Sequence, residues 1–230
     1  MICQYKLDDR IVYQYDMPVI HSNMYMILSG NEALIIDPHV SEEAFRMLED
    51  QGIQRVTMIL THEHYDHISG VNAVRELITD CTVYGSDTCK QMVPIPDKNL
   101  SAYFMAIFIG RSDDEVQQAQ ELFGGQYSCE VDVGFTGRYE LVWQGIQFEL
   151  IETPGHSPGS ICIVVKSDQK TYLFSGDSLV QGAKVITRLP SGDKAAYKNI
   201  TKPILEAFPE GTIVFPGHGM ESLIETLEIV

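Results

Sequence analysis

The sequence predicts an α/β protein in which strands and helices mix along a single domain. Short apolar runs of strand length recur from residue 23 to residue 215, and helical patterns with capping residues lie between several of them. The chain has 230 residues, 44% of them hydrophobic, which is enough for one substantial core. No linker, low-complexity tract or internal repeat marks a boundary. One layered domain over residues 1–230 is therefore expected.

The predicted strands are short apolar runs rich in β-branched and aromatic residues. In chain order they cover residues 23–28, 33–37, 55–61, 81–85, 139–143, 148–153, 161–166, 171–175 and 212–215.

Three helices are predicted between these strands. Ser41 caps the first, which runs to about Gly52, and two glutamates in its first turn complement the helix dipole. The second covers residues 68–79. The third follows Ser112, whose spacing to Glu115 is that of a capping box, and it ends before Gly124. On this third helix Val116, Ala119 and Phe123 are expected to share a face.

Charge and cysteine content limit the partners and the compartment. The net charge is −16, from 16 Lys and Arg against 32 Asp and Glu, so the chain would repel a phosphate backbone and nucleic acid is not expected as a partner. No apolar run approaches the length of a membrane span, and no leader pattern opens the chain. The five cysteines lack paired spacing, which predicts reduced thiols and a cytoplasmic protein with no membrane partner.

Several predicted strands run directly into residues that bind metals. "VTMIL" precedes "THEHYDH", "FELIETPG" precedes His156, "TYLFSG" precedes Asp177 and "TIVFPG" precedes His218; Asp37 closes "ALIID" in the same way. If these strand ends meet at one edge, their side chains form one site. Twice the lead-in is Pro-Gly-His, where glycine permits a positive φ or a close approach.

The ligand types and their spacing predict two divalent metal ions. Residues two apart in an extended loop point the same way, so His62 and His64 would bind the first ion, and His156 would complete three imidazoles with a fourth position open. Zn²⁺ suits such ligands best, with Fe or Mn as alternatives. The second ion would take the ligands just beyond and one from the end of the chain, and an aspartate would bridge the two ions: Asp66, His67 and His218, with Asp177 as the bridge.

The sequence resembles the metallo-β-lactamase-fold hydrolases. The resemblance is carried by "HEHYDH", by His156 in "PGHSPG", by Asp177 in "SGDS" and by His218 in "PGHG", and it extends from about "NMYMILSGNEALIIDP" to "VFPGHG". It implies a four-layer αββα sandwich of two mixed β-sheets flanked by helices, with two metals at the edge between the sheets. The likeness is closest to the glyoxalase II-like branch, which hydrolyses thioesters.

Two departures from that branch are visible. Twelve residues follow His218, so the C-terminal helical extension with which glyoxalase II enzymes hold glutathione is expected to be absent, and His39 stands where the family often has glycine. The expected activity is hydrolysis of a small-molecule thioester, ester or lactone by a metal-bridging hydroxide. The catalytic residues would be His62, His64, His156 and Asp66, with Asp66 as a ligand and orienter rather than a general base.

Residues outside the ligand set carry weaker predictions. Asp37 would either cap a helix, hold a loop or orient a metal-binding histidine as a second-shell group. Arg188 and Lys184 would clamp an anionic substrate or else be surface charges.

Five further residues carry expectations. Tyr65 and Tyr197 are candidate oxyanion donors by residue type alone. His21 and His39 are expected to be structural or exposed, and Glu63 is expected to point away from its histidine neighbours.

Residues 93–138 are expected to form a specificity insertion, because they contain no ligand candidate. Their apolar run, residues 102–109, would be a lid over the site, a packed core element or the contact of a homodimer.

Three other function classes fit the sequence less well. A mononuclear iron oxygenase of the persulfide dioxygenase type would use His62 and His64 with a pair such as His156 and Asp177. A nuclease is disfavoured by the net charge. A non-catalytic binding module would normally have lost a ligand, and none is missing.

Overall fold

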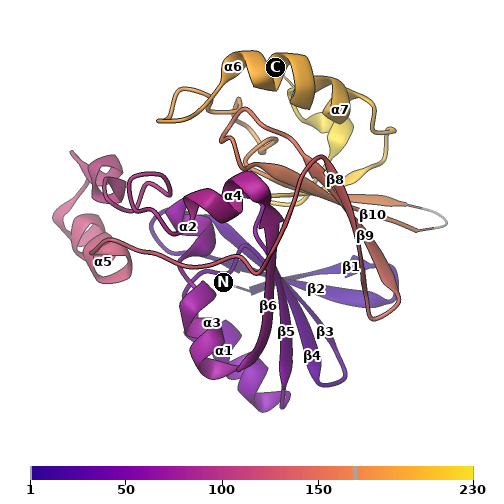
Figure 1. The fold of residues 1–230 in the computed structure, drawn as a ribbon, viewed down its shortest axis with the longest axis horizontal. Coiled ribbons are helices and arrows are strands. Elements are labelled where there is room, and N and C mark those ends of the chain that lie inside the picture. The colour runs from indigo at the N-terminus through magenta and orange to yellow at the C-terminus, as the bar shows by residue number, and fades with distance from the viewer. Residues whose placement is uncertain (1, 168–169, 230) are drawn as a thin grey trace.

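The computed structural model describes residues 2–167 and 170–229. Its strands form two mixed sheets that face each other, with helices on the outer sides (Figure 1). The first sheet has the order β1-β2-β3-β4-β5-β6-β7 and the second β13-β12-β11-β10-β9-β8. The predicted sandwich of two mixed sheets flanked by helices is confirmed.

The first sheet changes from antiparallel to parallel halfway across. β1 to β4 pair antiparallel, whereas β4, β5, β6 and β7 are parallel neighbours. The strands are β1 (Ile2–Leu7), β2 (Arg10–Asp16), β3 (Asn23–Ser29), β4 (Glu32–Ile36), β5 (Arg55–Ile59), β6 (Asp80–Ser86) and β7 (Val133–Phe135). Connecting helices are α1 (Glu42–Asp50), α2 (Tyr65–Ile68), α3 (Val71–Leu77), α4 (Asp87–Met92), η1 (Phe104–Phe108) and α5 (Asp113–Phe123).

The second sheet is antiparallel apart from one pair. Its strands are β8 (Arg138–Trp143), β9 (Ile146–Glu152), β10 (Ile161–Lys166), β11 (Thr171–Gly176), β12 (Ile213–Pro216) and β13 (Ser222–Leu223). β11 and β12 run parallel, because the chain between them crosses over through α6 (Lys194–Ala196), η2 (Tyr197–Thr201) and α7 (Lys202–Glu206). The short η3 (Ile224–Thr226) follows β13.

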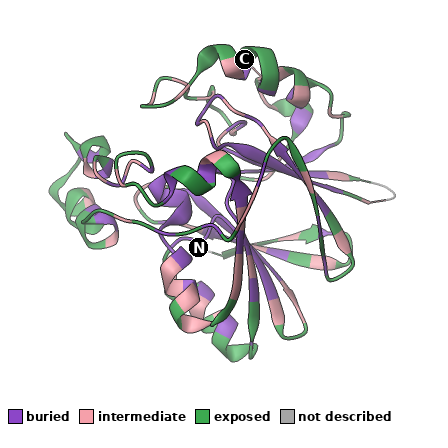
Figure 2. Cartoon of the chain, in the orientation of Figure 1, coloured by how far each residue is buried: buried purple, intermediate pink, exposed green. Residues whose placement is uncertain are grey.

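The main core lies between the two sheets. Tyr25 of β3, Phe174 of β11 and Phe215 of β12 pack with ring centroids 4.8 to 5.5 Å apart. Separate clusters of buried side chains lie under the helices on each outer side. Both faces of the central strands are therefore covered, which Figure 2 shows as buried residues along their length. This double coverage explains why these strands read as nearly continuous apolar runs.

All the predicted strands are present, to within a few residues at their ends. Four strands were not predicted: β1, β2, β7 and β13. β1 lies at the sheet edge, with exposed or half-buried residues at five of its six positions, and β7 and β13 have only three and two residues. Such segments lack the apolar signal on which the strand prediction depends.

The prediction of one helix over residues 68–79 is wrong. The chain forms α2 and α3 with a break at Gly70, whose N–H donates to the Pro38 carbonyl. A Cβ at Gly70 would lie 2.5 Å from the His39 carbonyl carbon. The break therefore brings the loop after β4 against the start of α3.

The two capped helices are confirmed. Ser41 accepts from the Ala44 N–H, and the capping box of Ser112 and Glu115 is complete. The face predicted for α5 is only partly right, since Ala119 and Phe123 are buried but Val116 is 36% exposed.

The apolar run of residues 102–109 is divided between core and surface. Phe104 and Phe108 of η1 are buried with Phe123 in the cluster outside the first sheet, whereas Ile107 and Ile109 are exposed. A lid or dimer contact at the exposed side stays a prediction. Within residues 2–167 and 170–229, no helix is both long and apolar enough to cross a membrane.

Candidate metal centre

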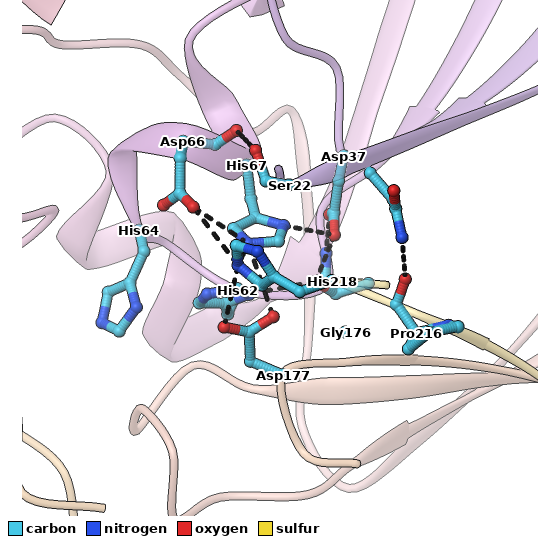
Figure 3. Close-up of polar contacts among 12 residues, drawn as sticks. Ser22, Asp37, His62, His64, Asp66, His67, Gly176, Asp177, Pro216 and His218 are labelled. Carbon is cyan, nitrogen blue, oxygen red and sulfur yellow. Dashed lines mark hydrogen bonds and ion pairs between the residues drawn. The ribbon is translucent and has the colours of Figure 1, made fainter. Parts of the chain in front are cut away.

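The predicted ligand residues converge at the edge where the strand ends of the two sheets meet (Figure 3). Backbone hydrogen bonds join the sheets at this edge. The Ile161 N–H donates to the Thr61 carbonyl at 2.7 Å, and Ser22 forms an isolated bridge with His218. The loops that carry the ligands are thus held together by both sheets. In Figure 3, Asp66 lies on one side of the histidine rings and Asp177 on the other.

The first group, here called the histidine half, consists of His62, His64 and His156. One ring nitrogen from each lies within 4.8 Å of the others, and all three residues are buried. His156 donates from Nδ1 to the Ile186 carbonyl at 2.9 Å. In the neutral ring its Nε2 then has no proton, and the lone pair of this atom faces His64 Nδ1 at 3.0 Å. His62 Nδ1 contacts Thr61 Oγ1 at 3.0 Å, so its Nε2 is the inward atom.

The second group, here called the carboxylate half, consists of Asp66, His67 and His218. Asp66 Oδ2 lies 3.4 Å from His67 Nε2 and 3.5 Å from His218 Nε2. The two Nε2 atoms are 3.4 Å apart. The three side chains therefore surround a space of the size that one coordinated ion requires.

Asp177 lies between the halves. Its Oδ2 is 3.4 Å from His156 Nε2 and 3.5 Å from His218 Nε2, and its Oδ1 is 3.5 Å from His67 Nε2. A Cβ at Gly217 would lie 2.1 Å from Asp177 Oδ1, so only glycine allows the carboxylate to occupy this place. Asp177 is placed as a bridging ligand would be.

The donor atoms fit divalent metal ions. His62 Nε2 and Asp177 Oδ1 are buried, and neither has a hydrogen-bond partner. Buried polar atoms are normally paired, because leaving them unpaired costs free energy. Imidazole nitrogens and carboxylate oxygens that converge in this way match the ligand preference of zinc, iron or manganese.

The two halves differ in their electrostatics. Burial lowers the pKa of all three imidazoles in the histidine half, to about 3 for His64, so these rings are neutral and ready to bind metal. Burial also lowers the pKa of His67, but Asp66 and Asp177 outweigh it and raise the pKa to about 9. The pKa of His218 is raised well above its usual range because the same two carboxylates outweigh burial. Positive charge is thus favoured in the carboxylate half.

Asp37 contacts both the loop that follows β5 and the candidate ligand His67. Its carboxylate accepts from the Thr61 N–H at 2.6 Å, from Thr61 Oγ1 at 2.5 Å and from His67 Nδ1 at 3.0 Å. The last bond directs His67 Nε2 into the site. Ser41, not Asp37, caps α1, so the helix-cap interpretation is wrong and the loop interpretation is confirmed. The second-shell role stays a prediction, which the contact with His67 supports.

Glu63 points away from its histidine neighbours, as predicted. Ser157 Oγ donates to its Oε2 at 2.9 Å, and burial raises the pKa of this carboxyl to about 7. A Cβ at Gly159 would lie 2.3 Å from the same oxygen. This contact joins the loop of His62 and His64 to that of His156.

The Pro-Gly-His segments use glycine in the two ways expected. Gly155 has a φ of 146° and passes close to Tyr197, where a Cβ would lie 2.4 Å from the tyrosine Cβ. Gly217 instead makes room for the Asp177 carboxylate.

Several weaker predictions find other partners in the structure. Lys184 pairs with Glu228 at 3.1 Å on the surface, which does not support a substrate clamp. Tyr65 stacks on Tyr127 in an aromatic cluster with a centroid distance of 5.1 Å, and its role as an oxyanion donor stays a prediction. Arg188 is exposed, on the loop whose Ile186 carbonyl holds His156.

The remaining residues assigned by type have structural roles. The Tyr197 hydroxyl donates to the Ser178 carbonyl at 3.1 Å. His21 pairs with Asp16 on the surface. His39 is buried, and its ring nitrogens face the carbonyls of Tyr15 and Val40. Both histidines thus lie outside the ligand set, as expected.

Some residues that hold the site were not predicted. Thr61 links His62 to Asp37, and Ser22 donates from Oγ to the Asp66 carbonyl at 3.1 Å. Ile186 contributes only its backbone carbonyl. Apart from Thr61 beside His62, no local signal identifies them, because they contact ligands that are distant in the sequence.

Comparison with known proteins agrees with this geometry. A sequence model described as the metallo-beta-lactamase superfamily matches residues 17–218. The probable metallo-hydrolase YqgX of Bacillus subtilis (strain 168) is 30% identical over 213 residues, which cover 91% of this chain and 92% of that protein. A hydroxyacylglutathione hydrolase of Haemophilus ducreyi (strain 35000HP / ATCC 700724) is 27% identical, over 88% of this chain and 68% of that protein.

Solved structures show the same fold. The BLEG-1 B3 metallo-beta-lactamase superposes with a TM-score of 0.69 and 28% identity, covering 98% of this chain and 95% of that one. TTHA1623 in a di-iron-bound form has a TM-score of 0.64 at 23% identity, over 93% and 95% of the two chains. ETHE1 from Myxococcus xanthus also scores 0.64, at 20% identity, over 93% and 80%.

Proposed function

Because the chain belongs to the metallo-beta-lactamase superfamily, we propose that it is a dinuclear metal-dependent hydrolase of a small thioester, ester or lactone. The observation that carries the proposal is the second ligand set. Asp66, His67 and His218 converge within 4.8 Å beside a complete histidine half. Seven ligand-type side chains are more than a single tetrahedral site uses.

The residues of the candidate centre would have different roles in binding the metal ions. Two divalent ions, when bound, supply a water-derived nucleophile near neutral pH and positive charge for the carbonyl oxygen and the leaving group. The histidine half would hold the first ion with three neutral imidazoles, and Asp177 lies close to both halves. Asp66 is oriented by His67 and His218, which supports a ligand role rather than that of a general base.

Substrate would approach from the side of His218 and Asp177. Their side chains are 29% and 14% exposed, whereas that of His67 is fully buried. The relatives named hydroxyacylglutathione hydrolases support a thioester or a related acyl compound as the substrate class. The net charge of −16 disfavours nucleic acid. A cytoplasmic location is part of the proposal, since the five cysteines are free thiols.

The second candidate is a mononuclear iron oxygenase that acts on persulfides. It would use His62, His64, His156 and Asp177, which also converge here. That function gives no role to His218, whereas the dinuclear hydrolase uses it beside Asp66 in the second ligand set.

Metal analysis combined with a substrate panel tests the proposal. The purified chain, supplied with zinc, iron and manganese in turn, is assayed on an ester, a thioester, a phosphodiester and a persulfide. Two ions per chain and turnover of the ester or thioester are expected. A single iron with oxygen uptake on the persulfide would establish the alternative.

A further inference from the structure

The loop that carries His218 is held by a side chain from the opposite sheet. Asn23 opens β3 and is 1% exposed, and its Nδ2 lies 2.9 Å from the Pro216 carbonyl and 2.8 Å from the Gly219 carbonyl. Carbonyl oxygens only accept hydrogen bonds, so the amide nitrogen must face them. One side chain thus binds the loop on both sides of His218.

Neighbouring groups fix the orientation of this amide. Gln14 Nε2 donates to Asn23 Oδ1 at 2.6 Å and also reaches the Gly219 carbonyl at 3.1 Å. The Tyr25 hydroxyl donates to the Pro216 carbonyl at 2.7 Å. The Asn23 backbone N–H donates to the Gly217 carbonyl at 2.7 Å. The loop therefore has few conformations available while Asn23 stays in place.

The adjacent residue connects the same strand to the other ligands of the carboxylate half. Ser22 bridges with His218 and donates from Oγ to the Asp66 carbonyl, a contact drawn in Figure 3. The start of β3 thus sets the relative position of Asp66 and His218. The histidine half has no contact with Asn23 among those that the structure describes.

We propose that Asn23 is a positioning residue for the second metal ion. It holds the segment from Pro216 to Gly219 so that His218 faces Asp66 and His67. The inference rests on the proposed dinuclear function. Replacing Asn23 should weaken the second site and leave the first unchanged, because outer partners of metal ligands typically alter affinity about 10- to 100-fold.

The test variant is Asn23→Asp, which keeps the shape but directs a carboxylate oxygen at two carbonyl oxygens. The matched control is Asn99→Asp. Asn99 is also fully buried, and its Nδ2 donates to the Val93 and Tyr127 carbonyls, each at 2.8 Å, far from the ligands in the sequence. Both variants lose an equivalent pair of bonds, so a general loss of stability should affect them alike.

Zinc titration against a chelator measures both affinities in the wild type and the variants. In Asn23→Asp the second zinc should bind about 10- to 100-fold more weakly, and saturating zinc should restore much of the turnover. Asn99→Asp should bind both ions as the wild type does. If circular dichroism shows that Asn23→Asp does not fold, Tyr25→Phe replaces it, and a severalfold weaker second site is expected from the loss of one bond to Pro216.

The outcomes separate this inference from the proposed function. A wild-type chain that binds one zinc overturns the dinuclear site itself. A wild-type chain with two zinc ions and a folded Asn23→Asp variant with two equally tight ions overturns only the role of Asn23. Equal weakening in Asn99→Asp would also overturn it, because the effect would then be general.

Discussion

The histidine half and the carboxylate half place the same kind of side chain, an imidazole, in opposite electrostatic settings. In the histidine half, burial keeps the imidazoles neutral, and the pKa of His64 falls to about 3. In the carboxylate half, Asp66 and Asp177 outweigh burial and raise the pKa of His67 to about 9. The difference arises from the number of carboxylates beside each ring and not from burial, since both halves are largely buried.

This contrast predicts how each half gains a metal ion. The neutral imidazoles of the first half bind without losing a proton. In the second half a metal ion must displace the protons that the carboxylates hold on the histidines. If the proposed second ion binds in the carboxylate half, its occupancy should depend on pH and on the position of His218. We therefore expect the halves to respond separately to mutation.

The largest effect is expected from Asp177→Asn, because Asp177 Oδ2 lies 3.4 Å from His156 Nε2 in one half and 3.5 Å from His218 Nε2 in the other. The variant should lose metal at both sites and slow ester or thioester hydrolysis by orders of magnitude. Metal content and turnover measure this, with Asp114→Asn on the exposed face of α5 as the control. Loss confined to one half would show that Asp177 is not shared.

His218→Ala should affect the metal ion of one half only. The second ion should be lost and hydrolysis slowed by orders of magnitude, while one ion stays in the histidine half. Elemental analysis and activity check this, and circular dichroism confirms folding, since Asp66 would lose a partner at 3.5 Å. A folded variant with one iron and near-native oxygen uptake on a persulfide would contradict the hydrolase.

Asp37→Asn should weaken the carboxylate half more than the histidine half. Asp37 contacts His67 directly, whereas it reaches His62 only through Thr61. The second affinity should fall about 10- to 100-fold and the first less. Zinc titration compares the two. An equal fall in both would mean that Asp37 acts through the loop after β5 rather than through His67.

The smallest effect is a difference in pH dependence. A raised pKa means that His67 holds its proton at neutral pH, so protons compete with metal more strongly as the pH falls below about 9. Each unit below that value should weaken the second ion by about tenfold per proton displaced. The first ion should change little between pH 6 and pH 8, because His64 titrates at about 3. Parallel dependence of both affinities would contradict the comparison.

The sequence determined the ligand types, their order and the strands that carry them. His62, His64, His156, Asp177 and His218 each follow an apolar run, and that pattern needs no structure to be seen. The same holds for the capped helices, whose signals lie within a few neighbouring residues. The edge strands β1, β7 and β13 were not predicted from the sequence. β1 has little apolar content, and β7 and β13 are very short.

Only the tertiary structure decided which residues hold the ligands. Asn23 and His218 are 195 residues apart, and Gly70 breaks a helix because of a backbone contact with His39. The residue type of Tyr65 suggested an oxyanion donor, and only the structure shows that its ring stacks on Tyr127. The candidate ligands could be found in the sequence because histidine and aspartate are residue types that bind metals. Their supports could not, because an amide or hydroxyl gains its role from the partner that the fold places beside it.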